Sequence, residues 1–226
     1  MSTKRKLTLL SIGIVTLMLV CDQVLKIWVK THMKLKESIP EMPNYEPTNW
    51  FHIHFVENEG MAFGISFGEG IGKILLTIIR LGVVSLLIYY LHKLLKKKAA
   101  DWVIVTVFSL IIAGALGNII DSLFYGVIFN DSNINQVATL FPAEGGYAPM
   151  LFGRVVDMFY FPLFRMPNWI PGGYGGDWFF PAVFNVADVG VTVGISLMLI
   201  FNKRVFAQLE NKKKTEEIEA VKTETE

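Results

Sequence analysis

Four long apolar runs decide what this chain of 226 residues can fold into. They cover residues 7–28, 71–91, 102–124 and 183–201. A helix needs about 20 apolar residues to cross the hydrocarbon core of a bilayer, and each run is about that long. Because an open strand edge cannot be left in hydrocarbon, we expect each run to be a helix. The predicted fold class is an all-α membrane protein with four transmembrane helices.

The first run has an alternative interpretation as a cleaved secretory signal peptide, because three basic residues precede it. A cleavage site needs small side chains before it, whereas Met18, Leu19 and Val20 precede Cys21. Since three further apolar runs follow, we expect the first run to be retained as a span. The single cysteine also excludes an internal disulfide and a cysteine-based zinc site.

Basic residues predict the orientation of the four spans. Lysine and arginine concentrate in cytoplasmic flanks, and here they lie at 4–6, 93–98 and 203–214. These flanks alternate correctly with four crossings, so both termini and the loop between the second and third spans should be cytoplasmic. The connections 29–70 and 125–182 should then lie outside.

The segments outside the apolar runs differ in character. Residues 50–56 alternate between apolar and polar side chains, which predicts a short strand and a small extracytoplasmic β-region. Residues 208–226 are mostly Lys, Glu and Thr, so we expect a disordered cytoplasmic tail. Residues 1–207 then form one membrane domain.

Four aspartates gather at the outer face of this topology. Asp22, Asp121 and Asp188 lie near the outer ends of spans, and Asp157 lies in an apolar stretch of the second outer connection. A carboxylate in or near hydrocarbon costs about 2.5–3.5 kcal/mol, so each is a functional candidate. For Asp157 and Asp188 we favour function, because apolar residues surround both.

The other two aspartates have structural explanations. Asp22 can pair with Lys26, four residues later on the same helical face, and this role and a functional one remain equally open. Asp121 and Asn118 can form a polar contact that holds helices together, which is the preferred interpretation for that pair.

Two carboxyl groups held close together cannot both ionise cheaply, so they share one proton near neutral pH. The ionised group can take a proton from water as the water attacks an amide carbonyl. The protonated group can hydrogen-bond to the developing oxyanion and then act as the acid for the leaving nitrogen. Such a pair requires no metal and no other cofactor.

Other kinds of site have little support. His52 and His54 share one face of the predicted strand, and exposed strand histidines are the preferred interpretation over a metal site. The net charge of +1, without a basic patch outside the tails, argues against nucleic-acid binding. Arg80 lies inside the second span and needs an anionic or carbonyl partner, or a water-filled cavity.

Five polar segments together resemble the motifs of the lipoprotein signal peptidase family, also called signal peptidase II. In chain order they are Asp22-Gln-x-x-Lys26, Asn58-x-Gly60-x-Ala62-Phe63, Gly114-x-x-Gly117-Asn118-x-x-Asp121, Val155-Val156-Asp157-Met-Phe159 and Phe184-Asn185-x-Ala187-Asp188. Each short motif is weak alone, but five in the family's order on a four-span topology are a specific signal.

The resemblance implies an aspartic endopeptidase with Asp157 and Asp188 as its catalytic pair. Its reaction would remove the signal peptide of diacylglyceryl-modified prolipoproteins by cleaving before the lipidated cysteine. The implied partners are this substrate and membrane lipid, at the outer face of the bacterial cytoplasmic (inner) membrane; the oligomeric state stays open. The residues implied to bind substrate or support the site are Asp22, Lys26, Asn58, Gly60, Asn118, Asp121 and Asn185.

Two features depart from the family pattern. Ser122 stands where the family usually has an arginine after the aspartate, and Arg154 or Arg80 is a candidate substitute. Insertions at about 128–151 and 165–176 lengthen the second outer connection, which bears on substrate specificity.

Two alternatives come from other functional classes. Intramembrane acids and Arg80 would also suit a small transporter or channel component, although acids clustered at one face do not line a route across the membrane. A membrane scaffold that packs through Gly114 and Gly117 is the third interpretation.

Overall fold

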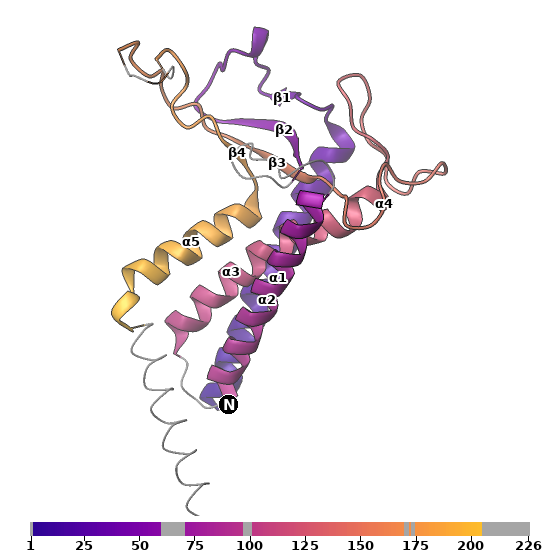
Figure 1. The fold of residues 1–226 in the computed structure, drawn as a ribbon. Helices are drawn as coiled ribbons and strands as arrows, with labels where there is room; N and C mark the ends of the chain where they lie inside the picture. Colours follow the sequence, from indigo (N-terminus) through magenta and orange to yellow (C-terminus); the bar gives the residue numbers. More distant parts are fainter. Residues whose placement is uncertain (1, 60–70, 97–100, 170–171, 173–174, 205–226) are drawn as a thin grey trace, which may run out of the picture.

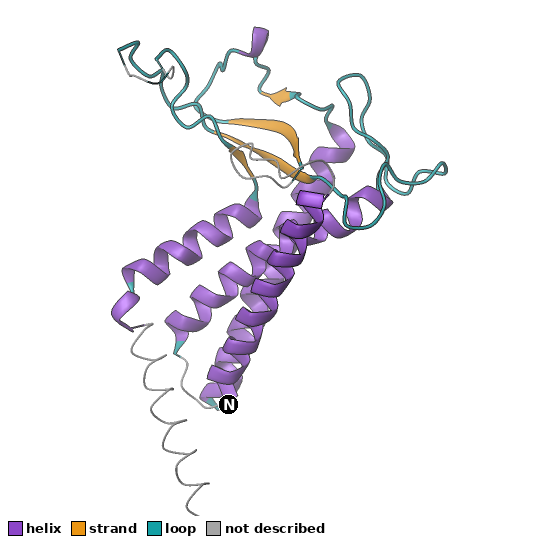
Figure 2. Ribbon diagram, viewed as in Figure 1, coloured by secondary structure: helices purple, strands orange, loops and turns teal. Residues whose placement is uncertain are grey.

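The structure is a computed structural model that describes residues 2–59, 71–96, 101–169, 172 and 175–204. Long helices form its body, and a small sheet lies across one end of them (Figures 1 and 2). These helices are α1 (Thr3–His32), α2 (Ile71–Lys96), α3 (Trp102–Ile120) and α5 (Val186–Ile200). The predicted disordered tail lies outside the described residues.

All four predicted runs form helices, but they differ in length. Within the described residues, three helices are long and apolar enough to cross a membrane, namely α1, α2 and α3 with its continuation to Ile128. Helix α5 has 15 residues, which span about 22 Å, and it is shorter than the predicted range 183–201. Helix α1 extends several residues beyond the predicted range 7–28 at both ends.

The third helix changes its winding near its outer end. After α3 come a π-helical turn, η2 (Asp121–Tyr125), and the short α4 (Gly126–Ile128). The helical segment therefore continues past residue 124, where the sequence predicted its end. Single π-turns inside α-helices occur frequently at functional sites, and this one begins at Asp121.

Small residues allow the helices to approach closely. A Cβ atom at Gly114 of α3 would lie 2.2 Å from the Ala187 carbonyl oxygen of α5. A Cβ atom at Gly117 would lie 2.6 Å from Asp22 Oδ2 of α1. Small residues at helix interfaces let backbones meet in this way in membranes. The Gly114–Gly117 stretch therefore brings α1 and α5 against the same part of α3.

The sheet has four antiparallel strands in the order β1-β2-β3-β4. They are β1 (Ser38–Ile39), β2 (His52–Asn58), β3 (Val155–Tyr160) and β4 (Val183–Phe184). The predicted β-region is present, and its predicted strand is β2. The sequence did not predict β3, which comes from the second outer connection and pairs Asp157 with Val56.

A hydrophobic core under the sheet fixes which way β3 faces. Val156 and Met158 of β3 pack with Val29 and Phe55, and all four side chains are buried. Successive side chains of a strand point to opposite faces, so Asp157 points away from this core. The burial of its two neighbours thus sets the direction of the Asp157 carboxyl.

The two strand histidines differ from the prediction. His52 is fully buried, and its Nδ1 lies 2.8 Å from the Pro40 carbonyl oxygen. His54 Nδ1 lies 2.6 Å from Ser38 Oγ. Both rings contact Tyr160, so they do share a face. The expectation of exposed histidines is wrong, because β1 and the chain before β2 cover them.

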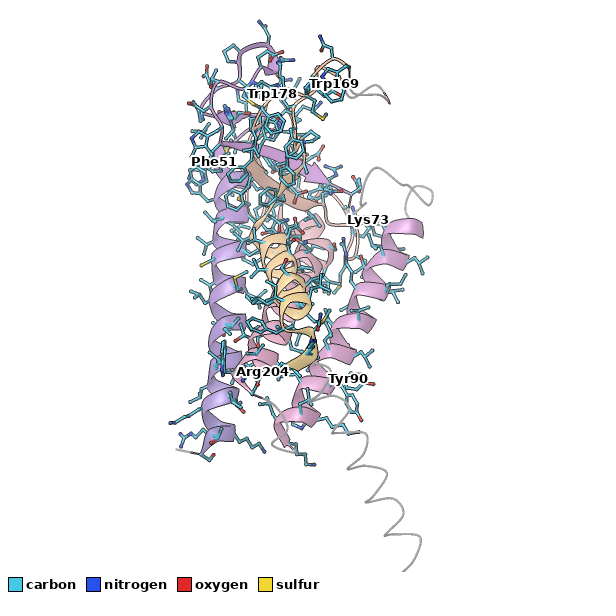
Figure 3. The ribbon with its side chains drawn as sticks, turned by 90° about the vertical axis from the view of Figure 1, so that its left-hand side faces the viewer. Phe51, Lys73, Tyr90, Trp169, Trp178 and Arg204 are labelled. Atoms are coloured by element: carbon cyan, nitrogen blue, oxygen red, sulfur yellow. The ribbon has the colours of Figure 1, made fainter. Side chains whose placement is uncertain are left out.

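The predicted outer segments and the predicted cytoplasmic loops can be compared with the two ends of the helix bundle. Lys73 lies near the sheet end of α2, and Trp169 and Trp178 lie beyond it, whereas Tyr90 and Arg204 lie at the opposite end (Figure 3). Residues predicted to be outside and residues flanking the predicted cytoplasmic loops therefore lie at opposite ends of the bundle.

Candidate active site

Asp188 is positioned by the start of helix α5. Asn185 is the N-cap, and its side-chain oxygen accepts a hydrogen bond from the Asp188 amide at 3.0 Å. The Asn185 amide donates to Asp188 Oδ2 at 3.2 Å. This reciprocal arrangement is a capping box, which satisfies two backbone donors that the first turn of a helix leaves unpaired. The cap therefore also fixes the Asp188 carboxylate.

Asp157 lies on β3, and only 5% of it is exposed. Its carboxyl accepts hydrogen bonds from Asn185 Nδ2 at 2.6 Å and from Asn58 Nδ2 at 3.4 Å. Burial, and then the nearby charge of Asp188, raise the pKa of Asp157 to about 7. A carboxyl with this pKa is about half protonated at neutral pH, so it can act as an acid.

Two asparagines connect the two aspartates. Asn185 donates its side-chain amide to Asp157 and its backbone amide to Asp188. Asn118 of α3 donates to Asp188 Oδ1 at 2.9 Å and accepts from Asn185 Nδ2 at 3.1 Å. The structure thus brings together four of the predicted site residues, which lie up to 70 positions apart.

A second, ionic cluster lies beside this pair. Lys26 Nζ lies 2.8 Å from Asp121 Oδ2 and 2.9 Å from Asp22 Oδ2, and all three side chains are buried. Lys26 also donates to Asn118 Oδ1 at 2.8 Å. Asp121 and Asn118 both bind Lys26. The predicted polar contact between Asp121 and Asn118 is therefore mediated by the lysine.

The ionic cluster also holds the backbone of the elements that carry the two aspartates. Asp22 Oδ1 accepts a hydrogen bond from the Ala187 amide of α5 at 2.8 Å. Asp121 Oδ2 accepts one from the Val156 amide of β3 at 3.2 Å. Each acid therefore anchors the residue directly before a candidate catalytic aspartate. This geometry gives Asp22 and Asp121 a structural role.

Gln23 is a site residue for which sequence reasoning assigned no role. Its side-chain amide donates to Asp121 Oδ1 at 3.0 Å and to the Gly117 carbonyl at 3.2 Å. Its carbonyl accepts from the Tyr125 hydroxyl at 3.1 Å. The signal available in the sequence was its place inside the Asp22-Gln-x-x-Lys26 motif.

Arg154 and Arg80, the two candidate substitutes for the family arginine, have different partners in the structure. Arg154 pairs instead with Glu57, at 3.0 Å, and with Asp131, at 2.6 Å. Arg154 is therefore held by acids of the outer connections, and the cation in contact with Asp121 is Lys26. Arg80 of α2 interacts electrostatically with Asp188, Asp157 and Asp121, so it remains the candidate.

Two predicted features remain to be placed. Asn58 lies at the end of β2, where it contacts Asp157. Gly60 and the rest of its motif lie outside the described residues. Lys73, in the first turn of α2, binds Glu59 at 2.5 Å and the Phe152 carbonyl at 2.9 Å.

Comparison with known proteins agrees with this geometry. The family model described as signal peptidase (SPase) II matches residues 14–203. The chain belongs to the signal peptidase II family. Membership makes it a protease of lipoprotein processing, and its apolar helices make it a bacterial membrane protein.

Relatives of this family match most of the chain. The lipoprotein signal peptidase of Porphyromonas gingivalis is 47% identical over 206 residues, which cover 90% of this chain and 87% of the relative. That of Amoebophilus asiaticus is 37% identical over 198 residues, which cover 87% and 78%. The similarity to these lipoprotein signal peptidases therefore extends over most of the chain.

Solved structures give the same fold. A bacterial membrane enzyme determined by the in meso method at 2.3 Å resolution has a TM-score of 0.52 and 26% identity, and it covers 86% of this chain and 87% of its own. A second such enzyme, determined at 1.9 Å, has a TM-score of 0.51 and 26% identity, with coverage of 84% and 90%.

Proposed function

We propose that this member of the signal peptidase II family is an intramembrane aspartic endopeptidase. It removes the signal peptide of diacylglyceryl-modified prolipoproteins by cleaving before the lipidated cysteine, with Asp157 and Asp188 as the catalytic pair. The observation that carries the proposal is that Asn185 donates to both carboxyl groups. One residue thereby holds two acids from distant elements at a single site.

The pair carries one proton, and the proton lies on Asp157. The raised pKa of about 7 supports this assignment, because burial and the charge of Asp188 both oppose ionisation of Asp157. Asp188 takes a proton from water while the water oxygen attacks the scissile carbonyl carbon. Asp157 gives its proton to the carbonyl oxygen.

Collapse of the resulting tetrahedral intermediate completes the reaction. The carbon–nitrogen bond breaks, and the proton on Asp188 passes to the leaving nitrogen. The carbonyl re-forms and returns its proton to Asp157, which restores the starting state. The pair thus acts as base and acid in turn without a metal or other cofactor.

The surrounding residues position this pair. Asn58, Asn118 and Asn185 orient the two carboxyl groups through hydrogen bonds. Lys26 with its two acids fixes the backbone on which the pair is mounted. Gly60 belongs with the substrate-binding residues by its place in the family motif.

The proposed topology has four spans, with both termini in the cytoplasm and the site at the outer face of the inner membrane. Support comes from the site residues, which meet where the helices reach the sheet, while the basic flanks 92–96 and 203–204 lie at the other end of the helices. An outer-leaflet site suits a substrate whose lipid is anchored in the bilayer. Reporters fused at residues 97 and 145 should read cytoplasmic and outside, respectively.

Purified protein given a lipidated prolipoprotein and its unlipidated form tests the reaction. We expect cleavage of the lipidated form alone, and a fall of about 10³-fold or more in Asp157→Asn and in Asp188→Asn. Asp177→Asn, which changes an exposed acid of the outer segment, is the matched control and should retain activity.

Two results would contradict the proposal. Cleavage that persists in both single variants would remove the catalytic pair. Loss of cleavage on adding a chelator would replace the two-aspartate reaction with a metal-dependent one, whereas we expect chelator to have no effect.

A further inference from the structure

Part of the first insertion runs back along the outer end of the third helix. Helix α4 leads into this segment, which returns beside α4 before reaching β3 (Figure 1). Five backbone amides of the returning chain donate to carbonyls of residues 122–129. They are Phe141 to Ile128 at 2.7 Å, Tyr147 to Phe129 at 2.9 Å, Ala148 to Gly126 at 2.9 Å, Leu151 to Leu123 at 3.4 Å and Gly153 to Ser122 at 2.9 Å.

Glycines make this close approach possible. A Cβ atom at Gly146 would lie 2.1 Å from the Gly126 carbonyl oxygen, and one at Gly153 would lie 2.0 Å from the Asp121 carbonyl oxygen. Any larger residue would push the returning chain away from the helix. The contact is therefore a specific packing that the sequence at these positions permits.

The depth of the returning chain in the membrane follows from the length of the helix. The candidate span Trp102–Ile128 has 27 residues and is about 40 Å long, whereas the hydrocarbon core is about 30 Å thick. The last turns of the helix therefore lie at the boundary between acyl chains and headgroups. Because five residues between 141 and 153 bond to those turns, these five lie at the same depth.

Apolar side chains are exposed at this depth. Phe141 is 73% exposed and Met150 is 52% exposed, and Leu140 is exposed beside them. Phe124 and Val127 of the helix end are exposed too. Large exposed apolar patches of this kind mark interaction surfaces.

The backbone at Phe141 is strained in a way that presents its ring outward. Its φ is +52°, in the left-handed region that bulky residues seldom adopt. The hydrogen bond from its amide to Ile128 holds the residue in this conformation. Such strain is retained where the surrounding structure requires it, and it is common at sites of contact with ligands.

We propose that Phe124, Val127, Leu140, Phe141 and Met150 form a lipid-binding surface that inserts into the boundary layer of the adjacent leaflet. Its continuity with the lipid-facing side of a membrane-spanning helix identifies lipid as the occupant. The same segment continues through Gly153 into β3, which carries Asp157. Anchoring the insertion in lipid thus holds the start of β3 at a fixed height above the bilayer.

Nitroxide labels measure this insertion directly. Single cysteines replace Phe141 and Met150 on a Cys21→Ser background, with Asn135→Cys and Glu144→Cys as controls at exposed polar positions of the same insertion. The labelled proteins are reconstituted in vesicles of phosphatidylethanolamine and phosphatidylglycerol. We expect the ratio of accessibility to oxygen over a water-soluble nickel complex to be several-fold higher at 141 and 150 than at the controls.

Two outcomes would overturn the proposal. Equal ratios at all four positions would place the insertion in water. Protection of positions 141 and 150 from both reagents would mean that protein, such as a second copy of the chain, covers the surface. Neither outcome depends on cleavage, so the proposed reaction is tested separately.

Discussion

Two pairs of aspartates lie side by side in this protein, and their partners differ. Asp22 and Asp121 share the ammonium group of Lys26, at 2.9 and 2.8 Å. The carboxyl groups of Asp157 and Asp188 accept hydrogen bonds from amide groups of Asn58, Asn118 and Asn185, and both acids interact electrostatically with Arg80. The first pair is therefore held by direct contact with an ammonium group, whereas amide hydrogen bonds orient the second pair.

The different partners suggest different roles for the two pairs of aspartates. A buried carboxylate that is paired with a cation has its charge compensated, and breaking the pair leaves an uncompensated charge. A buried carboxyl beside a second acid holds its proton to higher pH, as Asp157 does. The first arrangement suits a stabilising role, and the second suits the acid–base role that we propose for Asp157 and Asp188.

Removal of the cation should produce the largest effect on stability. Lys26→Met leaves two carboxylates buried with no counter-ion, so we expect the free energy of unfolding to fall by about 3–5 kcal/mol. Unfolding in mixed detergent measures it. Arg204→Met, which breaks an exposed pair with Asp101, is the control and should cost about 0–1 kcal/mol. A stable but inactive Lys26→Met protein would assign Lys26 to the chemistry.

The next largest effect concerns Asn185, whose two roles can be separated. Serine is also a good N-cap, so Asn185→Ser should keep α5 stable while removing the amide that donates to Asp157. Asp157 becomes charged as it gives up its proton, and loss of a hydrogen bond to a charged group costs about 1.5–3 kcal/mol, so cleavage should slow by about 10–100-fold. Steady-state kinetics and thermal unfolding give the two readouts. Unchanged cleavage would show that the cap alone matters.

The amide-held pair should also determine the response to pH. The reaction needs the proton on Asp157, and the raised pKa of about 7 means that this proton is lost as the pH rises through 7. We expect kcat to fall about tenfold for each pH unit above that value. Thermal unfolding at the same pH values controls for loss of structure. A rate that stays constant from pH 6 to about pH 9 would contradict the assignment of the proton.

Asn58 should produce the smallest effect on catalysis. Its amide lies 3.4 Å from Asp157 Oδ2, compared with 2.6 Å for Asn185. Longer hydrogen bonds are weaker, so Asn58→Ala should slow cleavage by less than about tenfold. A loss as large as that in Asn185→Ser would mean that the two amides hold Asp157 equally.

Much of the candidate site could be predicted because isolated polar residues are easily recognised within long apolar runs. Asp188 and Asn118 stand out in helices that are otherwise apolar, and helical spacing places both at the same end of the bundle. Membership of the family was predicted from the five motifs and is confirmed by the comparisons. The catalytic role of the pair stays a prediction.

Other parts could not be predicted, because they depend on contacts between distant segments. Strand β3 lacks the alternation of a half-exposed strand, since Val155 to Met158 are all buried. Its partner β2 lies about a hundred positions away in the sequence. The burial of His52 and the pairing of Arg154 likewise depend on loops that no periodic pattern describes.

Titration of Asp157 itself tests most directly whether the two aspartates share a proton. Infrared difference spectra between wild type and Asp157→Asn isolate its carboxyl band as the pH is varied. We expect a midpoint near the pKa of about 7 in the wild type, and a lower midpoint in the Asp188→Asn background, because a neighbouring negative charge has been removed. A midpoint near that of an ordinary aspartate, or one that Asp188→Asn does not move, would contradict the shared proton.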